Sequence, residues 1–427
     1  MSKLTKREKI AQTAFLQVEQ IPSRQEKEIL VTLFATGRHE EAEKFARTMT
    51  SRFPENGFGW KVLGAVLKSQ GRTEESLAPM QKAATLMPQD HEAFNNLGLV
   101  LKDLQRLDHA VACHRHALTL KPDFAEAHNN LGLALRNQGH LDEAMVCYRR
   151  ALALKPDAPQ VLENLGAAYR DQGNIEKALT YYREKSRLLP EDEVTQYHIA
   201  VLAGENLEHP PAQYVEGVFD SYALTFDAHL QQDLKYKVPV QLVELLKQNR
   251  APSSSTAKWN VLDLGCGTGL VGSAIASEAK QLIGVDLSAK MLEKANARGI
   301  YHRLERADLL IASKNESSST YDVIISADVF IYVGKLDELF KEIKRLLTPG
   351  GHFAFSVEAP DNLSNGKHEA MIDAGYQLKN TGRYGHSMTA LTALAHQNGF
   401  LPIEAQSVQI RLDNDQPIMG HLLLWQA

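Results

Sequence analysis

Apolar and small residues recur along the first half of the chain at a constant spacing of 34 residues. The period is marked most clearly by prolines, which stand at Pro54, Pro88, Pro122, Pro156 and Pro190. Within four successive periods a leucine is followed directly by a glycine, at Leu63-Gly64, Leu97-Gly98, Leu131-Gly132 and Leu165-Gly166. One such segment cannot bury its apolar face alone, so the pattern predicts helix pairs that stack on their neighbours. We expect five repeats over 23–192, the first of them degenerate, behind an N-terminal helix over 1–22.

The period and the repeated positions resemble those of tetratricopeptide repeats, which form a superhelix with a concave inner surface. Asparagine stands at one phase of three successive repeats, as Asn96, Asn130 and Asn164. A column of amides can donate to and accept from an extended peptide backbone. In this the array is similar to the repeat domain of O-linked N-acetylglucosamine transferase, which holds peptides on an asparagine ladder. The resemblance implies a protein or peptide partner; the alternative is that the asparagines are repeat consensus and the array is a scaffold.

After Pro190 the period stops and the pattern changes to short apolar runs that alternate with amphipathic segments. Residues 193–250 are expected to be largely helical, because Phe219, Tyr222, Phe226, Leu230 and Leu234 follow a helical period. Residues 251–427 predict alternating strands and helices, and therefore a mainly parallel sheet with helices on both faces. The expected strands are 260–265, 281–287, 301–308, 321–329, 352–358, 401–411 and 417–427.

The candidate chemistry lies where the first two of these strands end. The first strand runs into Asp263-Leu264-Gly265-Cys266-Gly267-Thr268-Gly269, and Asp286 ends the second strand. Glycines at this spacing let the backbone turn tightly and approach a ligand closely. A carboxylate at the end of the second strand can accept hydrogen bonds from both hydroxyls of a ribose.

These motifs together resemble the class I S-adenosylmethionine-dependent methyltransferases, and the whole chain resembles methyltransferases that carry tetratricopeptide repeats. The resemblance implies a Rossmann-like seven-stranded sheet after the all-α superhelix, with S-adenosylmethionine as cofactor and 193–250 as a linker and cofactor-capping extension. The glycine loop would meet the methionine moiety, Asp286 the ribose and Asp308 the adenine. The implied cofactor residues are Tyr222, Asp263, Gly265, Cys266, Gly267, Gly269, Asp286, Leu287, Met291, Asp308, Leu309 and Ser326.

Methyl transfer from a sulfonium mainly requires that the reactants be oriented and water excluded, and an acceptor of high pKa also needs a base. The candidates for such a catalytic group are His386, Asp328 and Tyr384, although a lone histidine is more often structural. We expect a methyltransferase whose repeats recruit a protein or peptide acceptor. The alternatives are a small-molecule methyltransferase with the repeats as an assembly scaffold, and a cofactor-binding adaptor without catalysis.

The composition of the chain argues against several other classes of protein. The chain carries 47 Lys and Arg against 52 Asp and Glu, a formal charge of −5, which speaks against a dedicated nucleic-acid binder. Three cysteines exclude a disulfide framework and a four-cysteine zinc site, and no other cluster suggests a metal. Because the sequence has neither an 18-residue apolar run nor a signal peptide, we expect a cytoplasmic protein without membrane contact.

Overall fold

The computed structural model describes residues 21–223, 226–228, 236–249, 258–361, 374–413 and 416–427. They form two compact units, one ending at Pro190 and the other beginning at Glu191. Nearly all of the expected helix over 1–22 lies outside the described residues, as do Leu230 and Leu234.

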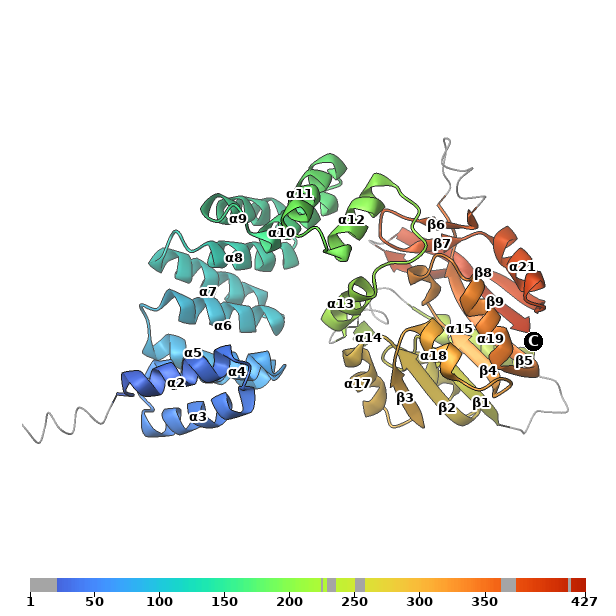
Figure 1. The fold of residues 1–427 in the computed structure, drawn as a ribbon, viewed down its shortest axis with the longest axis horizontal. Helices are drawn as coiled ribbons and strands as arrows, with labels where there is room; N and C mark the ends of the chain where they lie inside the picture. The colour runs from blue at the N-terminus through green and yellow to red at the C-terminus, as the bar shows by residue number, and fades with distance from the viewer. Residues whose placement is uncertain (1–20, 224–225, 229–235, 250–257, 362–373, 414–415) are drawn as a thin grey trace, which may run out of the picture. The chain divides into compact units, whose positions relative to one another are not determined.

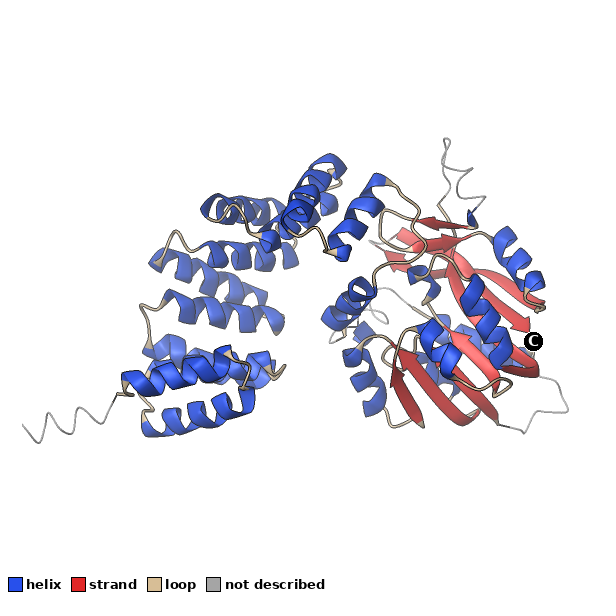
Figure 2. Ribbon diagram, in the orientation of Figure 1, coloured by secondary structure: helices blue, strands red, loops and turns tan. Residues whose placement is uncertain are grey.

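In its described residues the first unit consists of helices alone, as Figures 1 and 2 show. Consecutive helices pack as antiparallel pairs, and each pair packs on the next. The helices are α2 (Arg24–Ala35), α3 (His39–Arg52), α4 (Gly57–Ser69), α5 (Thr73–Leu86), α6 (His91–Asp103), α7 (Leu107–Leu120), α8 (Ala125–Asn137), α9 (Leu141–Leu154), α10 (Pro159–Asp171) and α11 (Ile175–Leu188). The repeat superhelix expected from the 34-residue period is therefore confirmed.

The repeated glycines are explained by the side chains that they face. A Cβ added at Gly98 would lie 2.6 Å from the His114 ring, and one at Gly132 would lie 2.5 Å from the Tyr148 ring. Each glycine lies on the first helix of a pair and faces a large, fully buried residue on the second. A larger residue at the glycine would push the two helices apart, so the glycine column sets their close approach.

The second unit combines helices with a sheet (Figure 1). Its helices are α12 (Glu193–Ala203), α13 (Ala212–Tyr222), α14 (Phe226–Ala228), α15 (Val238–Gln248), α16 (Leu270–Ile275), α17 (Ala289–Ala297), α18 (Leu309–Asn315), α19 (Asp337–Leu346) and α21 (Met388–Gln397). Its strands are β1 (Trp259–Leu264), β2 (Ala279–Asp286), β3 (Arg303–Arg306), β4 (Tyr321–Ser326), β5 (Leu347–Glu358), β6 (Tyr376–Leu378), β7 (Tyr384–His386), β8 (Leu401–Asp413) and β9 (Gln416–Gln426).

The strands form one sheet in which β3, β2, β1, β4 and β5 are parallel neighbours. β9 adds antiparallel to β5, and β8 adds antiparallel to β9. All seven expected strands are present, but the described residues place nine strands in the sheet. The two that the sequence pattern did not indicate, β6 and β7, have three residues each. A run that short has no measurable alternation of apolar and polar positions.

Helices cover both faces of the sheet, and successive strand residues point to opposite faces. On β1, Leu262 and Leu264 pack with α19 and α21, whereas Val261 packs with α15 and α16. This alternation is what buries both faces of a parallel sheet. Because helices cover both faces, a ligand can reach the backbone of the sheet at the carboxyl ends of its strands.

The short strands β6 and β7 belong to a separate apolar cluster. Tyr197 and Val201 of α12 pack there against Tyr376, Leu378 and Tyr384. β7 meets the main sheet at Glu358 of β5, beyond the last residue that β5 pairs with β4. The pair of short strands thus forms the platform on which α12 packs.

Candidate functional site

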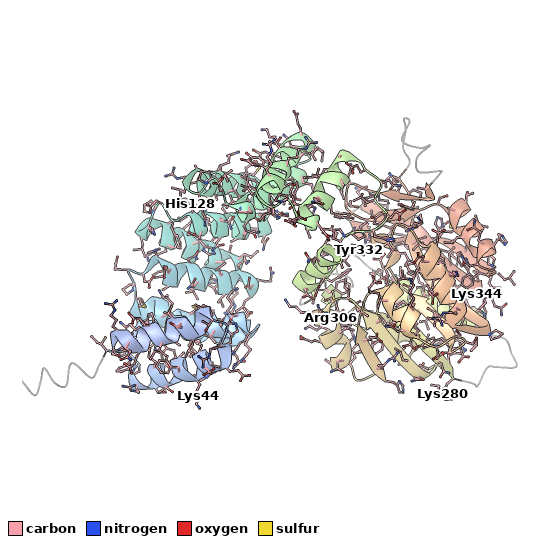
Figure 3. All side chains as sticks on the ribbon, in the orientation of Figure 1. Lys44, His128, Lys280, Arg306, Tyr332 and Lys344 are labelled. Carbon is pink, nitrogen blue, oxygen red and sulfur yellow. The ribbon has the colours of Figure 1, made fainter. Side chains whose placement is uncertain are left out.

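A cavity of about 680 Å³ opens at the carboxyl ends of the parallel strands of the second unit. Its walls come from the loops after β1, β2, β3 and β4, from α13 and α14, and from β8. Tyr332, labelled in Figure 3, lies in the short turn after β4 and contributes to the wall. Of the predicted site residues, those that line the cavity are Tyr222, Gly265, Cys266, Gly267, Asp286, Leu287, Asp308, Leu309 and Asp328.

The glycine loop exposes backbone atoms to the cavity at Gly265 and Gly267, which have no side chains. Gly265 has a φ of +73°, and a Cβ there would lie 2.3 Å from Val329 in the loop after β4. Gly267 has a φ of +53°, and an added Cβ would meet no atom within 4 Å. Gly265 is therefore needed for the close approach of two loops, and Gly267 leaves space that a ligand can use.

Asp286 is the acid that the geometry places best for a ribose. Its Oδ2 accepts the backbone N–H of Gly267 and its Oδ1 accepts that of Ser288, each at 2.8 Å. Each oxygen keeps a lone pair, and the side chain faces the cavity. Burial raises the pKa of the Asp286 carboxyl, and the backbone N–H groups of Ser288, Gly267 and Leu287 oppose that shift. Since those donors stabilise the charged form, the site holds a preoriented acceptor.

Asp263 lies behind the glycine loop and is not part of the cavity wall. Its carboxyl is fully buried and accepts the hydroxyl of Tyr301 at 2.6 Å. Burial raises the pKa of Asp263 to about 7, because the charged form is removed from water. The Tyr301 ring in turn packs against Gly272 and Gly284. In this structure Asp263 supports the loop from beneath rather than lining the space above it.

Three other predicted cofactor residues also lie behind the wall. Gly269 takes a φ of +88° and is the N-cap of α16. Met291 is fully buried on α17, and the Ser326 hydroxyl donates to the Leu264 carbonyl at 2.9 Å, which ties β4 to β1. Asp308 does line the cavity and also caps α18 by accepting two backbone N–H groups. The first three therefore shape the loops, and Asp308 remains available to a ligand.

Aromatic side chains cover one side of the cavity. Phe219 and Tyr222 on α13 and Phe226 on α14 all line it. The Phe219 and Tyr332 rings pack edge-on with their centroids 5.1 Å apart, and the Tyr222 and Phe226 rings pack edge-on with their centroids 5.2 Å apart. The helical period seen in the sequence thus corresponds to a cavity-facing stripe over the described part of this segment.

A buried network of charges meets the cavity at Asp328. Both carboxylate oxygens of Asp328 accept the same nitrogen of Arg411, at 2.9 and 2.8 Å. Arg411 is 2% exposed and also pairs with the buried Glu358, which in turn accepts Lys379 at 3.1 Å. Asp328 has a φ of +61°, a conformation that few non-glycine residues adopt. The network fixes one carboxylate at the cavity in a defined orientation.

The structure does not bring the other two predicted catalytic residues to the cavity. Tyr384 is fully buried in the cluster that α12 packs on, and His386 is 2% exposed. The Nε2–H of His386 donates to the Gly334 carbonyl at 3.1 Å, and burial lowers the pKa of His386 to about 4. A base must reach the proton that it removes. Tyr384 and His386 were predicted to be catalytic, but both stand on β7, which lies between β5 and β6 in the sheet and buries their side chains.

Two members of the asparagine column, Asn130 and Asn164, connect neighbouring repeats by hydrogen bonds, which we call braces. The Asn130 amide donates to Asn95 of the preceding repeat at 3.0 Å, and the Asn164 amide donates to Asn129 at 2.8 Å. Asn164 is only 4% exposed, whereas Asn96 and Asn130 are half-buried. One N–H and the carbonyl of Asn130 remain for another partner. The column is therefore shared between repeat packing and any peptide.

Sequence reasoning missed several residues of the site. Arg411, Tyr236 and Val329 line the cavity from β8, from the segment before α15 and from the loop after β4. No motif surrounds Arg411 or Tyr236, whereas Val329 directly follows the predicted residue Asp328. Arg411 stands at the end of an expected strand that already mixes apolar and polar residues, so no signal in the sequence marked it.

Within the described residues, no helix is long and apolar enough to cross a membrane. The same residues contain no group of three or more His, Cys, Asp or Glu side chains placed to hold a metal ion.

Comparison with known proteins finds similarity for both parts of the chain. Residues 262–353 match the model of a methyltransferase domain, residues 100–139 and 132–173 that of a TPR repeat, and residues 161–194 that of a tetratricopeptide repeat. The chain is 32% identical to a malonyl-[acyl-carrier protein] O-methyltransferase of Halalkalibacterium halodurans, over 39% of this chain and 62% of that protein. It is 28% identical to a ubiquinone biosynthesis O-methyltransferase of Pectobacterium atrosepticum, over 30% of this chain and 54% of that protein.

The chain thus spans between half and two thirds of the length of these relatives. Among solved structures, a thermophilic TPR protein of Thermus thermophilus is similar to 42% of this chain and 98% of its own, with 21% identity and a TM-score of 0.37.

Proposed function

Because the chain combines tetratricopeptide repeats with a methyltransferase domain, we propose that it transfers the methyl group of S-adenosylmethionine to a protein or peptide recruited by the repeats. The observation that carries the cofactor assignment is the Asp286 carboxylate, held by two backbone donors at the edge of a cavity floored by glycine backbone. The cofactor, once bound, supplies the activated methyl group on a sulfonium.

The residues of the cavity fit that cofactor in three places. Asp286 has a free lone pair on each oxygen for two ribose hydroxyls. Asp308 stands at the end of the next strand for the base, and Gly267 leaves open space beside the loop for the methionine moiety. Phe219 and Tyr222 exclude water from the other side.

Asp328 is the residue of the cavity best placed to orient an acceptor. Its carboxylate is held in one orientation by Arg411, at the end of β4 and beside the glycine loop. A carboxylate that already shares its charge with a guanidinium suits accepting a hydrogen bond from an acceptor N–H or O–H. We assign Asp328 this orienting role, and Tyr384 and His386 a structural role on the platform.

Recruitment by the repeats can be tested separately from catalysis. Lysate is incubated with tritiated cofactor and with either the full chain or residues 191–427, and protein is separated from small molecules. Label that enters a protein only with the full chain supports recruitment. Label in small molecules supports the second candidate, a small-molecule acceptor of the kind suggested by the name of the ubiquinone biosynthesis O-methyltransferase relative, with the repeats as scaffold.

The asparagine column has its own matched control. Alanine at Asn96, Asn130 and Asn164 removes the proposed peptide contacts together with two braces between repeats. Alanine at Asn95 and Asn129 removes the same two hydrogen bonds from the other side, together with the buried Asn95–His114 hydrogen bond. If the column binds the acceptor, the triple variant raises the acceptor KM more than the double variant does. Equal KM values would assign the column to repeat packing alone.

A further inference from the structure

The segment that covers the cavity is tied to the domain by three carboxylates. This segment, which we call the strap, consists of α13 and α14, residues 212–222 and 226–228. Its aromatic residues face the cavity, and its acidic residues Glu216, Asp220 and Asp227 reach the loops of the sheet. On α13 the acids are four residues apart, so one side of the helix carries them.

Asp227 makes the most extensive of these contacts. Its Oδ1 accepts the Thr268 hydroxyl and its Oδ2 accepts the Arg298 guanidinium, each at 2.5 Å. Arg298 also donates through Nε to the Thr268 carbonyl at 2.5 Å. Thr268 lies between Gly267 and Gly269 of the glycine loop. The strap therefore holds the side chain of this loop directly and its backbone through Arg298.

Asp220 and Glu216 tie the strap to the next two loops. Asp220 accepts the hydroxyl of Ser288, two residues after Asp286, at 2.5 Å. Glu216 pairs with Arg306, two residues before Asp308, and Arg306 donates to the Leu287 carbonyl at 3.2 Å. Arg306 is labelled in Figure 3.

We propose that Glu216, Asp220 and Asp227 are latches that keep the strap closed, and that opening of the strap sets the rate at which cofactor and its demethylated product exchange. This inference rests on the proposed function, since it assumes that the cavity binds S-adenosylmethionine. Each of the three acids binds a different loop, and each loop would hold a different part of the cofactor. Closure of the strap is therefore coupled to all three loops. None of the three acids lines the cavity, so the latches are not cofactor contacts.

A gate and a contact have different kinetic signatures. Loss of a cofactor contact raises the dissociation rate and the Kd together. Loss of a latch that is closed with and without ligand raises the association and dissociation rates together and leaves the Kd nearly constant. The two rates are measured with tritiated S-adenosylhomocysteine and the full chain, so no acceptor is needed.

The variants are Glu216→Gln, Asp220→Asn and Asp227→Asn, which keep the side-chain volume and remove the charge. We expect Asp227→Asn to speed both association and dissociation about tenfold, the factor for one lost charge-assisted hydrogen bond, with a Kd within about threefold of wild type. The control is Glu342→Gln, which breaks the 2.7 Å pair with Arg345 on α19, outside the cavity. It should leave both rates unchanged.

Salt provides a test that does not depend on how the variants fold. The Arg306–Glu216 and Arg298–Asp227 pairs are partly exposed, so raising the salt concentration weakens them. Exchange by wild type should accelerate with salt, and exchange by the triple variant should be fast and insensitive to salt. Unchanged rates in the variants, or a rise in Kd equal to the rise in dissociation rate, would overturn the latch. A wild-type chain that binds no S-adenosylhomocysteine would overturn the proposed function and the latch with it.

Discussion

Replacing Asp286 with asparagine should weaken cofactor binding without weakening the fold. The carboxylate offers one free lone pair on each oxygen, and each charge-assisted hydrogen bond is worth about 1.5–3 kcal/mol. Asparagine keeps one acceptor oxygen and loses the charge. We therefore expect a loss of about 2–4 kcal/mol, which weakens S-adenosylhomocysteine binding about 30- to 700-fold.

Stability should respond differently, because burial raises the pKa of Asp286. A carboxyl with a raised pKa in the folded state releases its proton more readily when unfolded, so its charge opposes folding at neutral pH. Removing that charge offsets the backbone hydrogen bond that one carboxylate oxygen no longer accepts, so the ligand-free protein should stay as stable as wild type, within about 1 kcal/mol. The combination of a large affinity loss and an unchanged fold is specific to a binding residue.

Calorimetry with S-adenosylhomocysteine and thermal melts with and without it measure the two quantities. The matched control is Asp322→Asn, because Asp322 also accepts a backbone N–H, from Asn260 at 2.8 Å, but at the other end of the strands. That variant should melt at a lower temperature and bind S-adenosylhomocysteine normally. A folded Asp286→Asn protein with an affinity within threefold of wild type would refute the cofactor assignment.

Three further predictions concern stability and domain independence. Burial lowers the pKa of His114 to about 4 from an unfolded value near 6.5, so the repeats keep their full stability above pH 6.5 and lose up to about 3 kcal/mol as the pH falls towards 4. His114→Tyr, the residue type of the two following repeats, should remove that loss in urea melts followed by circular dichroism at pH 5 and pH 7. Residues 191–427 should fold alone and bind S-adenosylhomocysteine as the full chain does, and an insoluble or non-binding fragment would contradict this. Arg411→Met leaves Asp328 without its buried cation and Glu358 with Lys379 alone, and it should cost about 3–5 kcal/mol in unfolding free energy, more than Glu342→Gln costs.

What the sequence by itself determined was whatever depends on local spacing. The 34-residue period predicted the helix pairs, because each repeat buries its face against a neighbour close in the chain. Asp286 and the glycine loop were predictable because both follow directly from the end of a strand. The same holds for the aromatic stripe of α13, which needs only the helical period of residues on one element.

The tertiary structure alone decided which residues reach the cavity. Asp263 lies in the same short motif as Gly267, yet the pleat of β1 and the Tyr301 hydroxyl hold it behind the loop. His386 stands on a strand of three residues, too short to show a pattern, and that strand places it in the interior. Arg411 reaches Asp328 only because β8 pairs with β9 and β9 with β5, across 83 residues of sequence. Contacts of that separation depend on the pairing of whole strands, and no local periodicity records them.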